Sequence, residues 1–347
     1  MNCVTIGGYK MHKRRFNEFT LSFTIRPQGP LLIKSGQESG ADPTLLDMNF
    51  VRTHHGRLGD STVYLPGSSL KGTLRSYAEK VARTLGEERG DHFPPFSCNP
   101  LGSSAARGRD EYYCGKYLDK KGGQADKHRL ACPICRTFGH TSLASHLRLS
   151  DAYPLDPLQP DVMTWFEAAN DTEERDGVAI DRVSGAVAVG PFNLEVVTQG
   201  AFQGTLTLTN FQLWQLGLLA IVLRDLGQGR VPIGFGKSRG LGRVAVEYAQ
   251  AEIAYPGRFR PETKGRNLQE SLMGVAAFLS PEDRRAYDYF PEDPEAMPDG
   301  WIMHEEDDGR YGRVALTGES EAINNLWRTC VPSWANFVET WRGTPDG

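Results

Sequence analysis

The strongest constraint on the fold is the spacing of apolar residues along the chain, which changes in a definite order from that of a strand to that of a helix. Residues 19–25 alternate apolar and polar side chains, a period of two that predicts a half-buried strand. Residues 70–81 then place apolar side chains at spacings of four, three and four, which predicts an amphipathic helix with Ser68 or Ser69 as its N-cap. The fold therefore begins with a strand followed by a helix.

The second half of the chain continues this order. Short apolar or alternating runs predict strands at 147–149, 178–180, 194–197 and 203–209. A buried helix is expected over 211–226, capped by Asn210 and ended by Gly227, followed by a strand over 240–248. The order strand, helix, strands, helix, strand matches the split β-α-β pattern of an α+β, ferredoxin-like domain. A doubly wound fold would need more pairs of strands and helices.

Length and composition set the domain organisation. The 347 residues, 39% hydrophobic and 24% charged, suit a globular protein of about two domains and exclude dominant disorder. We expect a core over 14–255 and a Pro-rich, acidic C-terminal extension over 256–347. No apolar run approaches the roughly 18 residues of a membrane span, and residues 1–13 lack the apolar stretch of a signal peptide. We therefore expect a cytoplasmic protein with no membrane partner.

An insertion at about 88–145 has no strong apolar period, so something other than an apolar core must hold it together. It contains Cys132 and Cys135, whose two-residue spacing lets both thiolates bind one tetrahedral zinc ion. Cys98 and Cys114 lie upstream and can complete the site. Four protein ligands leave no open position for a water nucleophile, so such a zinc would be structural.

Two alternatives concern this cysteine set. His128 or His92 could replace one of the upstream cysteines as a ligand. A thioredoxin-type redox pair has the same Cys-x-x-Cys spacing, but the strand and helix expected around such a pair are missing here. Zinc is therefore the favoured interpretation, and reduced cytosolic thiols agree with it.

Net charge is −4, which at first argues against a nucleic-acid partner. The average hides an uneven distribution, because residues 282–308 hold eleven acidic residues against two arginines. Residues 227–243 hold four basic residues and no acidic one. A local basic surface for nucleic acid is therefore compatible with the composition.

The start of the first helix is one candidate for that surface. Residues 65–72 place free backbone N–H groups and the Ser68 and Ser69 hydroxyls at a helix N-terminus, which favours anions. Lys71 and Arg75 add positive charge of the kind a phosphate backbone requires. A capped helix with solvated basic residues is the alternative.

A glycine-rich loop at 234–242 is the second candidate. It fails the spacing of a P-loop, and it leads into a strand where a dinucleotide fingerprint would need a helix. Its backbone can approach a phosphate closely, with Lys237 and Arg239 as the charges. A tight glycine turn between strands would have the same composition.

Four segments in this order resemble the RAMP superfamily of CRISPR-associated proteins, and most closely the backbone subunit of type III effector complexes. They are 65–75, the run Cys-Pro-Ile-Cys-Arg-Thr-Phe-Gly at 132–139, Ala-Ile-Asp-Arg at 179–182, and the glycine loop. The resemblance covers roughly 19–248. It implies an RRM-like core that binds CRISPR guide RNA and stacks with copies of itself and other type III subunits. The expected RNA-binding residues are Ser68, Ser69, Lys71, Arg75, Arg182, Lys237 and Arg239.

The resemblance also implies a catalytic residue and a hairpin. In that family an Asp between the first strand and the first helix cuts target RNA with a divalent metal, and Asp47 is the match by position. A carboxylate there can recruit Mg²⁺ or orient the attacking 2′-hydroxyl. Glu38 and Asp42 are rival acids in the same loop, and a solvated carboxylate is the alternative. Residues 178–183 resemble the base of a thumb-like hairpin that separates guide and target bases, although an Asp181–Arg182 surface pair would also explain Arg182.

The sequence thus predicts a zinc-stapled RAMP subunit that holds guide RNA and cleaves complementary target RNA with Mg²⁺ or another divalent cation. Three alternatives stay open. The subunit could bind without cutting, or it could process guide RNA without metal through His54 or His55 as general base. It could also be a scaffold whose acidic 282–308 segment binds a basic partner.

Overall fold

The computed structural model describes residues 14–36, 48–56, 61–87, 94–102, 112–154, 162–256, 270–292, 294–306 and 313–342. Its main element is a six-stranded sheet in which all neighbouring strands are antiparallel. The spatial order is β11 (Ile302–Glu306), β12 (Arg313–Glu319), β8 (Val244–Pro256), β1 (Glu18–Pro27), β7 (Phe202–Thr209) and β4 (Leu147–Leu149). No helix in the described ranges is both long and apolar enough to cross a membrane.

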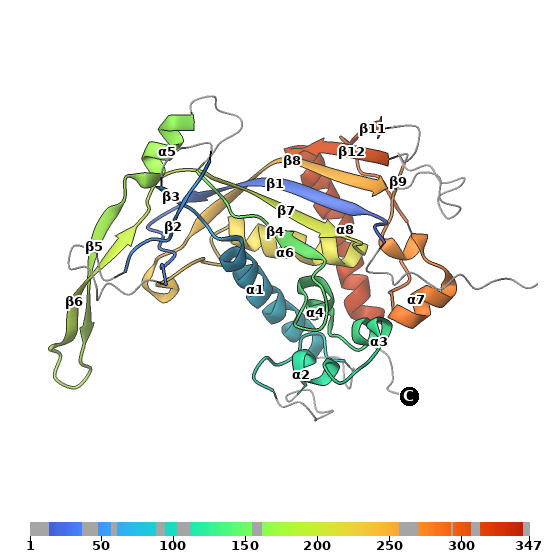
Figure 1. The fold of residues 1–347 in the computed structure, drawn as a ribbon, viewed down its shortest axis with the longest axis horizontal. Helices are drawn as coiled ribbons and strands as arrows, with labels where there is room; N and C mark the ends of the chain where they lie inside the picture. The colour runs from blue at the N-terminus through green and yellow to red at the C-terminus, as the bar shows by residue number, and fades with distance from the viewer. Residues whose placement is uncertain are drawn as a thin grey trace, which may run out of the picture.

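Four of these strands form the predicted core with two helices. Along the chain the order is β1, α1 (Gly67–Glu87), β4, β7, α6 (Leu213–Gly227) and β8, while in space the strands lie as β8-β1-β7-β4. This is the β-α-β-β-α-β arrangement of a ferredoxin-like fold, so the α+β prediction is confirmed. Figure 1 shows α1 and α6 on the same side of the sheet.

The alternation of β1 explains which side the helices cover. Phe19, Leu21, Phe23 and Ile25 are buried, whereas the residues at 18, 20 and 22 are only partly covered. Phe19 pairs with Leu208 and Leu21 with Leu206, so two neighbouring strands present their apolar side chains to the same layer. The period of two therefore places the core between the sheet and its helices.

Both helix caps proposed from sequence are wrong. Helix α6 begins after Gln212, whose side chain forms a capping box with Gln215. Asn210 instead has a positive φ of 50° and accepts a hydrogen bond from the backbone of Phe16. The α1 helix begins at Gly67, so both serines lie inside it.

The C-terminal residues complete the sheet. Strand β8 extends beyond the predicted 240–248 because β12 pairs along its second half, from Gln250 to Pro256. Helix α8 (Ser320–Thr340) then packs against α6, where Trp214 and Phe337 stack with ring centroids 4.3 Å apart. Residues of the predicted extension thus cover part of the core that the first 255 residues leave open.

The remaining elements surround this core. A hairpin of β5 (Glu173–Ile180) and β6 (Val187–Val196) projects from one end of the molecule (Figure 1). The others are β2 (Arg52–His54), β3 (Ser61–Val63), α2 (Cys114–Leu118), α3 (Gln124–Arg129), α4 (Pro133–Phe138), α5 (Val162–Asn170), β9 (Ser271–Leu272), α7 (Pro281–Tyr287), β10 (Glu295–Ala296) and the 3₁₀ turns η3 (Lys237–Arg239) and η5 (Val275–Phe278).

Candidate metal centre and nucleic-acid interface

The four predicted cysteines meet in one buried cluster beneath α1. The Sγ atoms of Cys98, Cys114, Cys132 and Cys135 all lie within 4.8 Å of one another. Cys132 is the N-cap of α4, with Pro133 at the first helical position, and its sulfur accepts a hydrogen bond from the backbone N–H of Cys135 at 3.4 Å. The short helix thereby turns both cysteines of the pair toward the same point.

The cluster fits a tetrahedral metal ion in number, spacing and donor type. Four thiolates are the ligand set of a closed zinc site. Burial raises the pKa of the Cys114 and Cys132 thiols, whereas hydrogen bonds from the neighbouring thiols lower the pKa of Cys98. A bound cation would offset the cost of burying several thiolates together.

His128 does not join this cluster. The Nδ1 atom of His128 lies 2.7 Å from the carbonyl oxygen of Tyr287, and its ring packs against Tyr289. His128 therefore connects α3 to α7. His92 lies outside the described residues.

Two predicted RNA-binding residues of α1 point toward the cysteine segment. Lys71 donates to Ser145 Oγ at 2.8 Å and to the carbonyl of Leu147 at 2.9 Å, and burial lowers its pKa. Arg75 donates to the carbonyl of Gly139 at 2.9 Å and to Cys135 Sγ at 3.3 Å. These contacts tie α1 to the cluster.

Electrostatics hold Arg75 in its charged form. Burial opposes the charge, but Cys135 and Glu79 outweigh it and raise the pKa of Arg75 above its usual range. The Nε atom of Arg75 lies 3.0 Å from Glu79, and Arg83 contacts the same carboxylate at 3.3 Å. Arg83 also donates to the carbonyl of Cys98 at 3.1 Å. Arg75, Glu79 and Arg83 thus form a row of ion pairs on the side of α1 that faces the cluster.

A second arginine connects the cluster to the C-terminal residues. Arg136, only 2% exposed, donates to the carbonyl of Asp288 and to its carboxylate, both at 2.8 Å. The guanidinium also lies over the ring of Trp341 at 5.3 Å. Asp288 adopts a φ of +54° directly after α7, which aims its carbonyl and side chain at Arg136. The run Cys-Pro-Ile-Cys-Arg therefore holds two parts of the chain together.

The predicted anion site at the α1 N-terminus already holds a carboxylate. Asp151 Oδ1 accepts a hydrogen bond from the backbone N–H of Gly67 at 2.8 Å. Gly67 is packed so closely that a Cβ atom would lie 2.6 Å from the carbonyl oxygen of Leu149. Ser68 is exposed and Ser69 is partly buried. Asp151 supplies the favourable charge that a phosphate was expected to bring.

The glycine loop keeps its charges at the surface. A Cβ on Gly234 would lie 2.2 Å from the carbonyl of Leu32, and one on Gly242 would lie 2.0 Å from that of Ile233, so both positions need glycine. Lys237 and Arg239 occupy the exposed turn η3 between them. Desolvation and the nearby Lys80 lower the pKa of Lys237.

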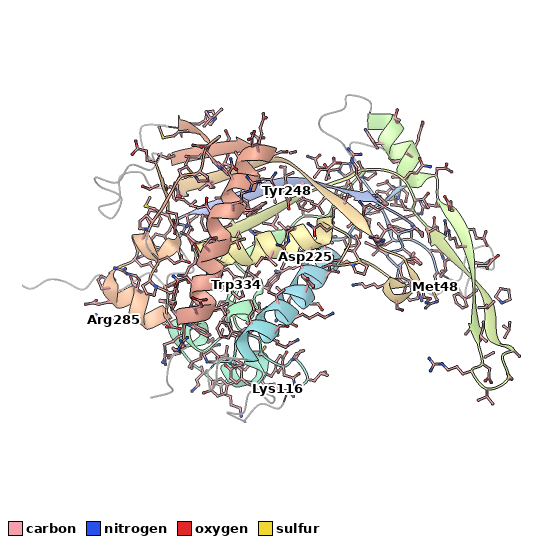
Figure 2. The ribbon with its side chains drawn as sticks, turned by 180° about the vertical axis from the view of Figure 1, so that it is seen from behind. Met48, Lys116, Asp225, Tyr248, Arg285 and Trp334 are labelled. Atoms are coloured by element: carbon pink, nitrogen blue, oxygen red, sulfur yellow. The ribbon has the colours of Figure 1, made fainter. Side chains whose placement is uncertain are left out.

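Backbone pairing brings this loop beside the segment that follows Asp47, which begins at Met48. Phe235 donates its N–H to the carbonyl of Leu32 at 2.7 Å, and Ser35 donates to that of Asn49 at 2.9 Å. Met48 donates to the carbonyl of Asn193 in β6 at 3.1 Å. Figure 2 places Met48 beside the base of the hairpin. Asp47, Asp42 and Glu38 themselves lie outside the described residues.

The hairpin presents apolar side chains at its far end. Ile180 is 62% exposed and Val183 is 98% exposed. Asp181 accepts hydrogen bonds from the backbone of Val183 at 2.6 Å and of Ser184 at 3.2 Å, which lower its pKa. Asp181 therefore shapes the turn, and Arg182 is exposed beside it. Residues 178–183 form the tip of the hairpin, which corrects their assignment to its base.

The family model of the RAMP superfamily matches the chain over residues 24–245. The chain belongs to the RAMP superfamily. Its members are CRISPR-associated RNA-binding proteins, which agrees with the ferredoxin-like core of this chain. The match spans the cysteine cluster, the hairpin and the glycine loop. No curated protein matches the chain.

Sequence analysis missed a buried carboxylate in this RAMP domain. Glu195, 7% exposed, accepts hydrogen bonds from Phe50 N–H at 2.7 Å and Thr172 Oγ1 at 2.9 Å. It also forms an ion pair with Arg52. The available signal was a charged residue within the apolar run 194–197. Its role is to hold the segment after Met48 against the hairpin base.

Two further lysines and two histidines lie near the residues described above. Lys34 is exposed in the segment that pairs with Phe50, and Lys80 is exposed on α1. The residues around Lys34 and Lys80 in the sequence form no motif that would have predicted a binding site. His54 is exposed in β2, while the ring of His55 lies 4.4 Å from that of Tyr153.

Proposed function

We propose that this RAMP protein is a guide-RNA-binding backbone subunit of a type III CRISPR effector complex, acting in the cytoplasm with copies of itself and other subunits. One observation carries the proposal. The exposed basic glycine loop, the projecting hairpin and the segment flanking Asp47 adjoin one another on one side of the core.

Each part of this surface has a task in RNA binding. Lys237 and Arg239 contact phosphates, which position a strand without reading its sequence. Base pairing between guide and target supplies the sequence specificity. The apolar tip at Ile180 and Val183 enters between bases, and Arg182 contacts the backbone beside it. Ser68 and Ser69 offer hydroxyls, whereas Lys71 and Arg75 act through their contacts with the cysteine segment.

We further propose that Asp47 supports cleavage of target RNA. A divalent ion held by this carboxylate, with Asp42 or Glu38 as a rival ligand, would stabilise charge at the scissile phosphate. Glu195 supports this function because it fixes the chain after Met48 to β6.

The cysteine cluster is proposed as a structural zinc site. Cys98, Cys114, Cys132 and Cys135 would hold the ion, and their full complement leaves no position for substrate. We also propose that residues 14–255 form the RNA-binding unit and that 256–347 are an extension that completes its sheet. In this proposal the zinc site stabilises the contacts of α1 with the cysteine segment and, through Arg136, with the C-terminal extension.

Co-expression with a CRISPR array tests the function. Bound RNA is isolated, and complementary labelled RNA is added with Mg²⁺ to the wild type and to Asp47→Ala. Asp42→Ala and Glu38→Ala are the matched controls. We expect periodic cuts that are lost only in Asp47→Ala.

Other outcomes select the alternatives. Bound guide without cuts leaves a non-catalytic subunit. Cleavage of guide precursor in chelator, lost in His54→Ala or His55→Ala, indicates a processing enzyme. The absence of any co-purified RNA contradicts the proposal and favours a protein scaffold.

A further inference from the structure

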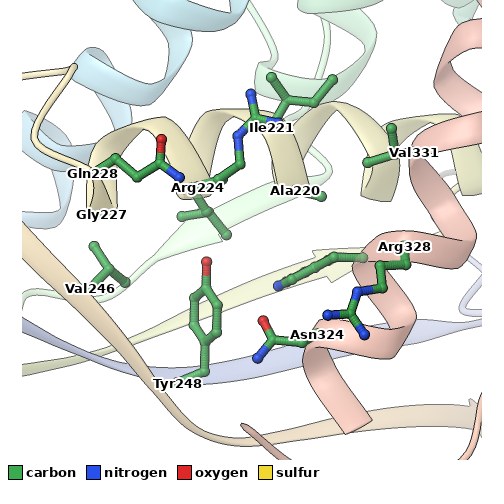
Figure 3. Close-up of a pocket in the computed structure, with 12 residues that line it drawn as sticks. Ala220, Ile221, Arg224, Gly227, Gln228, Val246, Tyr248, Asn324, Arg328 and Val331 are labelled. Atoms are coloured by element: carbon green, nitrogen blue, oxygen red, sulfur yellow. The ribbon is translucent and has the colours of Figure 1, made fainter. Parts of the chain in front are cut away.

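A groove of about 620 Å³ opens between α6, β8 and α8, away from the proposed RNA surface. Figure 3 shows α6 on one side, α8 on another and Tyr248 of β8 between them. None of its lining residues belongs to the hairpin or to η3. Its volume lies within the range of small-molecule sites, about 300–1,000 Å³.

The base of the groove is apolar and aromatic. Val246 and Tyr248 contribute from β8, and Trp327 contributes from α8. The rings of Tyr248 and Trp327 lie 6.1 Å apart at 69° to each other. In Figure 3 the Tyr248 hydroxyl points toward α6, so the ring stands between the walls. The groove therefore offers a flat aromatic surface with a hydroxyl at its end.

Two arginines, Arg224 and Arg328, are the charged residues that line the groove. Arg224 of α6 donates to Asp225 Oδ1 at 2.9 Å, and Arg230 lies 3.8 Å from the same oxygen. Tyr77 donates to the other carboxylate oxygen at 2.7 Å. One carboxylate thus serves two guanidinium groups. Across the groove, Arg328 is exposed and donates to Asn325 Oδ1 at 3.1 Å.

Two amide side chains lie beside these charges. Gln228 contributes from the end of α6 and Asn324 from α8, and both are exposed. An amide both donates and accepts hydrogen bonds, as the edge of a nucleobase also does. Guanidinium groups match phosphate oxygens in planar geometry. The lining therefore offers arginines for a phosphate, an aromatic ring for the face of a base and amides for the edge of a base.

We propose that this groove binds a nucleotide, either free or as the end of an RNA strand. The phosphate is bound by Arg224 and Arg328, and the base packs against Tyr248 with Gln228 and Asn324 at its edge. An acidic peptide would satisfy the arginines, but it would leave the Tyr248 ring and the amides of Gln228 and Asn324 without matching groups. The site is additional to the guide-RNA surface and does not depend on it.

The test uses the full chain, freed of RNA, and isothermal titration calorimetry. The probes are 5′-AMP, adenosine and a 5′-phosphorylated RNA tetranucleotide. We expect 5′-AMP to bind and adenosine to bind about tenfold more weakly, because it lacks the charge-assisted hydrogen bonds. Arg328→Glu is expected to weaken 5′-AMP binding at least about tenfold. Arg342→Glu, an exposed charge reversal beyond the end of α8, is expected to bind as the wild type does.

A second variant guards against effects on folding. Asn324 is exposed, and Asn324→Tyr fills the groove without changing charge, so it is expected to reduce 5′-AMP binding with an unchanged thermal midpoint. Both sources of the ligand support the proposal. Tighter binding of the tetranucleotide than of 5′-AMP, lost in Arg328→Glu, identifies a strand end, and equal or weaker binding identifies a free nucleotide.

Four results would overturn the proposal. They are no 5′-AMP binding at millimolar concentration, unchanged binding in Arg328→Glu, loss of binding in Lys237→Glu, and displacement of 5′-AMP by a glutamate-rich peptide at lower concentration. Guide-RNA affinity, measured in parallel, is expected to fall in Lys237→Glu and to stay unchanged in Arg328→Glu. Failure of the guide-RNA function is therefore distinguishable from failure of the nucleotide site.

Discussion

The segment around the cysteine cluster and the surface around the glycine loop both place basic residues beside glycine, yet they use them in opposite ways. Lys71 and Arg75 bind backbone carbonyls and a cysteine sulfur inside the protein. Lys237 and Arg239 stay exposed in a loop whose Gly234 packs against the carbonyl oxygen of Leu32. The comparison teaches that a basic residue near a helix start is as able to support a fold as to bind a phosphate.

The largest expected effect comes from the cluster itself. Cys132→Ser removes a ligand of a closed site, and metal binding there is coupled to folding, so we expect loss of metal and a fall in unfolding free energy of about 5 kcal/mol or more. Elemental analysis and thermal unfolding measure both. Cys330→Ala is the matched control, since Cys330 is buried but outside the cluster. Full metal content in Cys132→Ser would contradict the site.

The next largest effect is expected at the exposed basic residues of the glycine loop. Replacing Lys237 and Arg239 together by glutamate should weaken guide-RNA binding about 100-fold and lower the salt slope by about two charges, regardless of guide sequence. Filter binding over a salt series measures both quantities. The thermal midpoint should stay unchanged because both side chains are exposed. An unchanged slope would remove the glycine loop from the RNA surface.

The variant Arg75→Gln tests the contacts that Arg75 makes with the cysteine segment inside the protein. Loss of charged hydrogen bonds to Gly139 and Cys135 should lower the unfolding free energy by about 2 kcal/mol and speed metal release to a chromogenic chelator. Arg148→Gln, at an arginine whose side chain is 60% exposed, is the control and should change neither. If Arg75→Gln instead weakened RNA binding with stability intact, the inward role of Arg75 would be wrong.

The smallest expected effect is a pH dependence near the cluster. Burial lowers the pKa of His146, whose Nδ1 lies 2.7 Å from the carbonyl of Thr209. Because the folded state holds this ring neutral, stability is present above the unfolded pKa of about 6.5 and is lost as pH falls below it, by up to about 1.4 kcal/mol per pH unit. Chemical denaturation between pH 7 and 5.5 should show a shallower slope in His146→Gln. Identical slopes would assign the acid sensitivity to other groups.

Much of the fold was predictable because it depends on local periods. The alternation from Phe19 to Ile25 predicted β1, and the spacing from Leu70 to Val81 predicted α1. The predicted cap of α1 failed because the partner came from afar: Asp151 accepts a hydrogen bond from Gly67 across 84 positions. The predicted cap of α6 failed because Gln212 and Gln215 form a local capping box, while the Asn210 side chain binds the backbone of Phe16. Spacing predicted the Cys132–Cys135 pair, and its meeting with Cys98 and Cys114 agrees with the four-ligand hypothesis.

The site was less predictable because burial and pairing are not local properties. Glu195 stands in an apolar run, but its partners Phe50 and Arg52 are more than 140 positions away. Arg136 follows the Cys-x-x-Cys pair, but its carboxylate partner Asp288 lies 152 positions downstream. Their roles follow only from how the sheet and the cluster bring those segments together.

The sequence by itself determined the order of the core strands and helices, the four cysteines of the cluster and the set of basic residues, because each depends on residue type and short spacing. Only the tertiary structure decided which basic residues face inward and which face solvent. The physical reason is that a side chain's hydrogen-bond partners and its desolvation are set by whatever segment packs against it. For Lys71 and Arg75 that segment is 135–147, whose polar groups accept their hydrogen bonds. Lys237 and Arg239 remain exposed, and the guanidinium of Arg239 lies over the rings of Phe192 and Phe235.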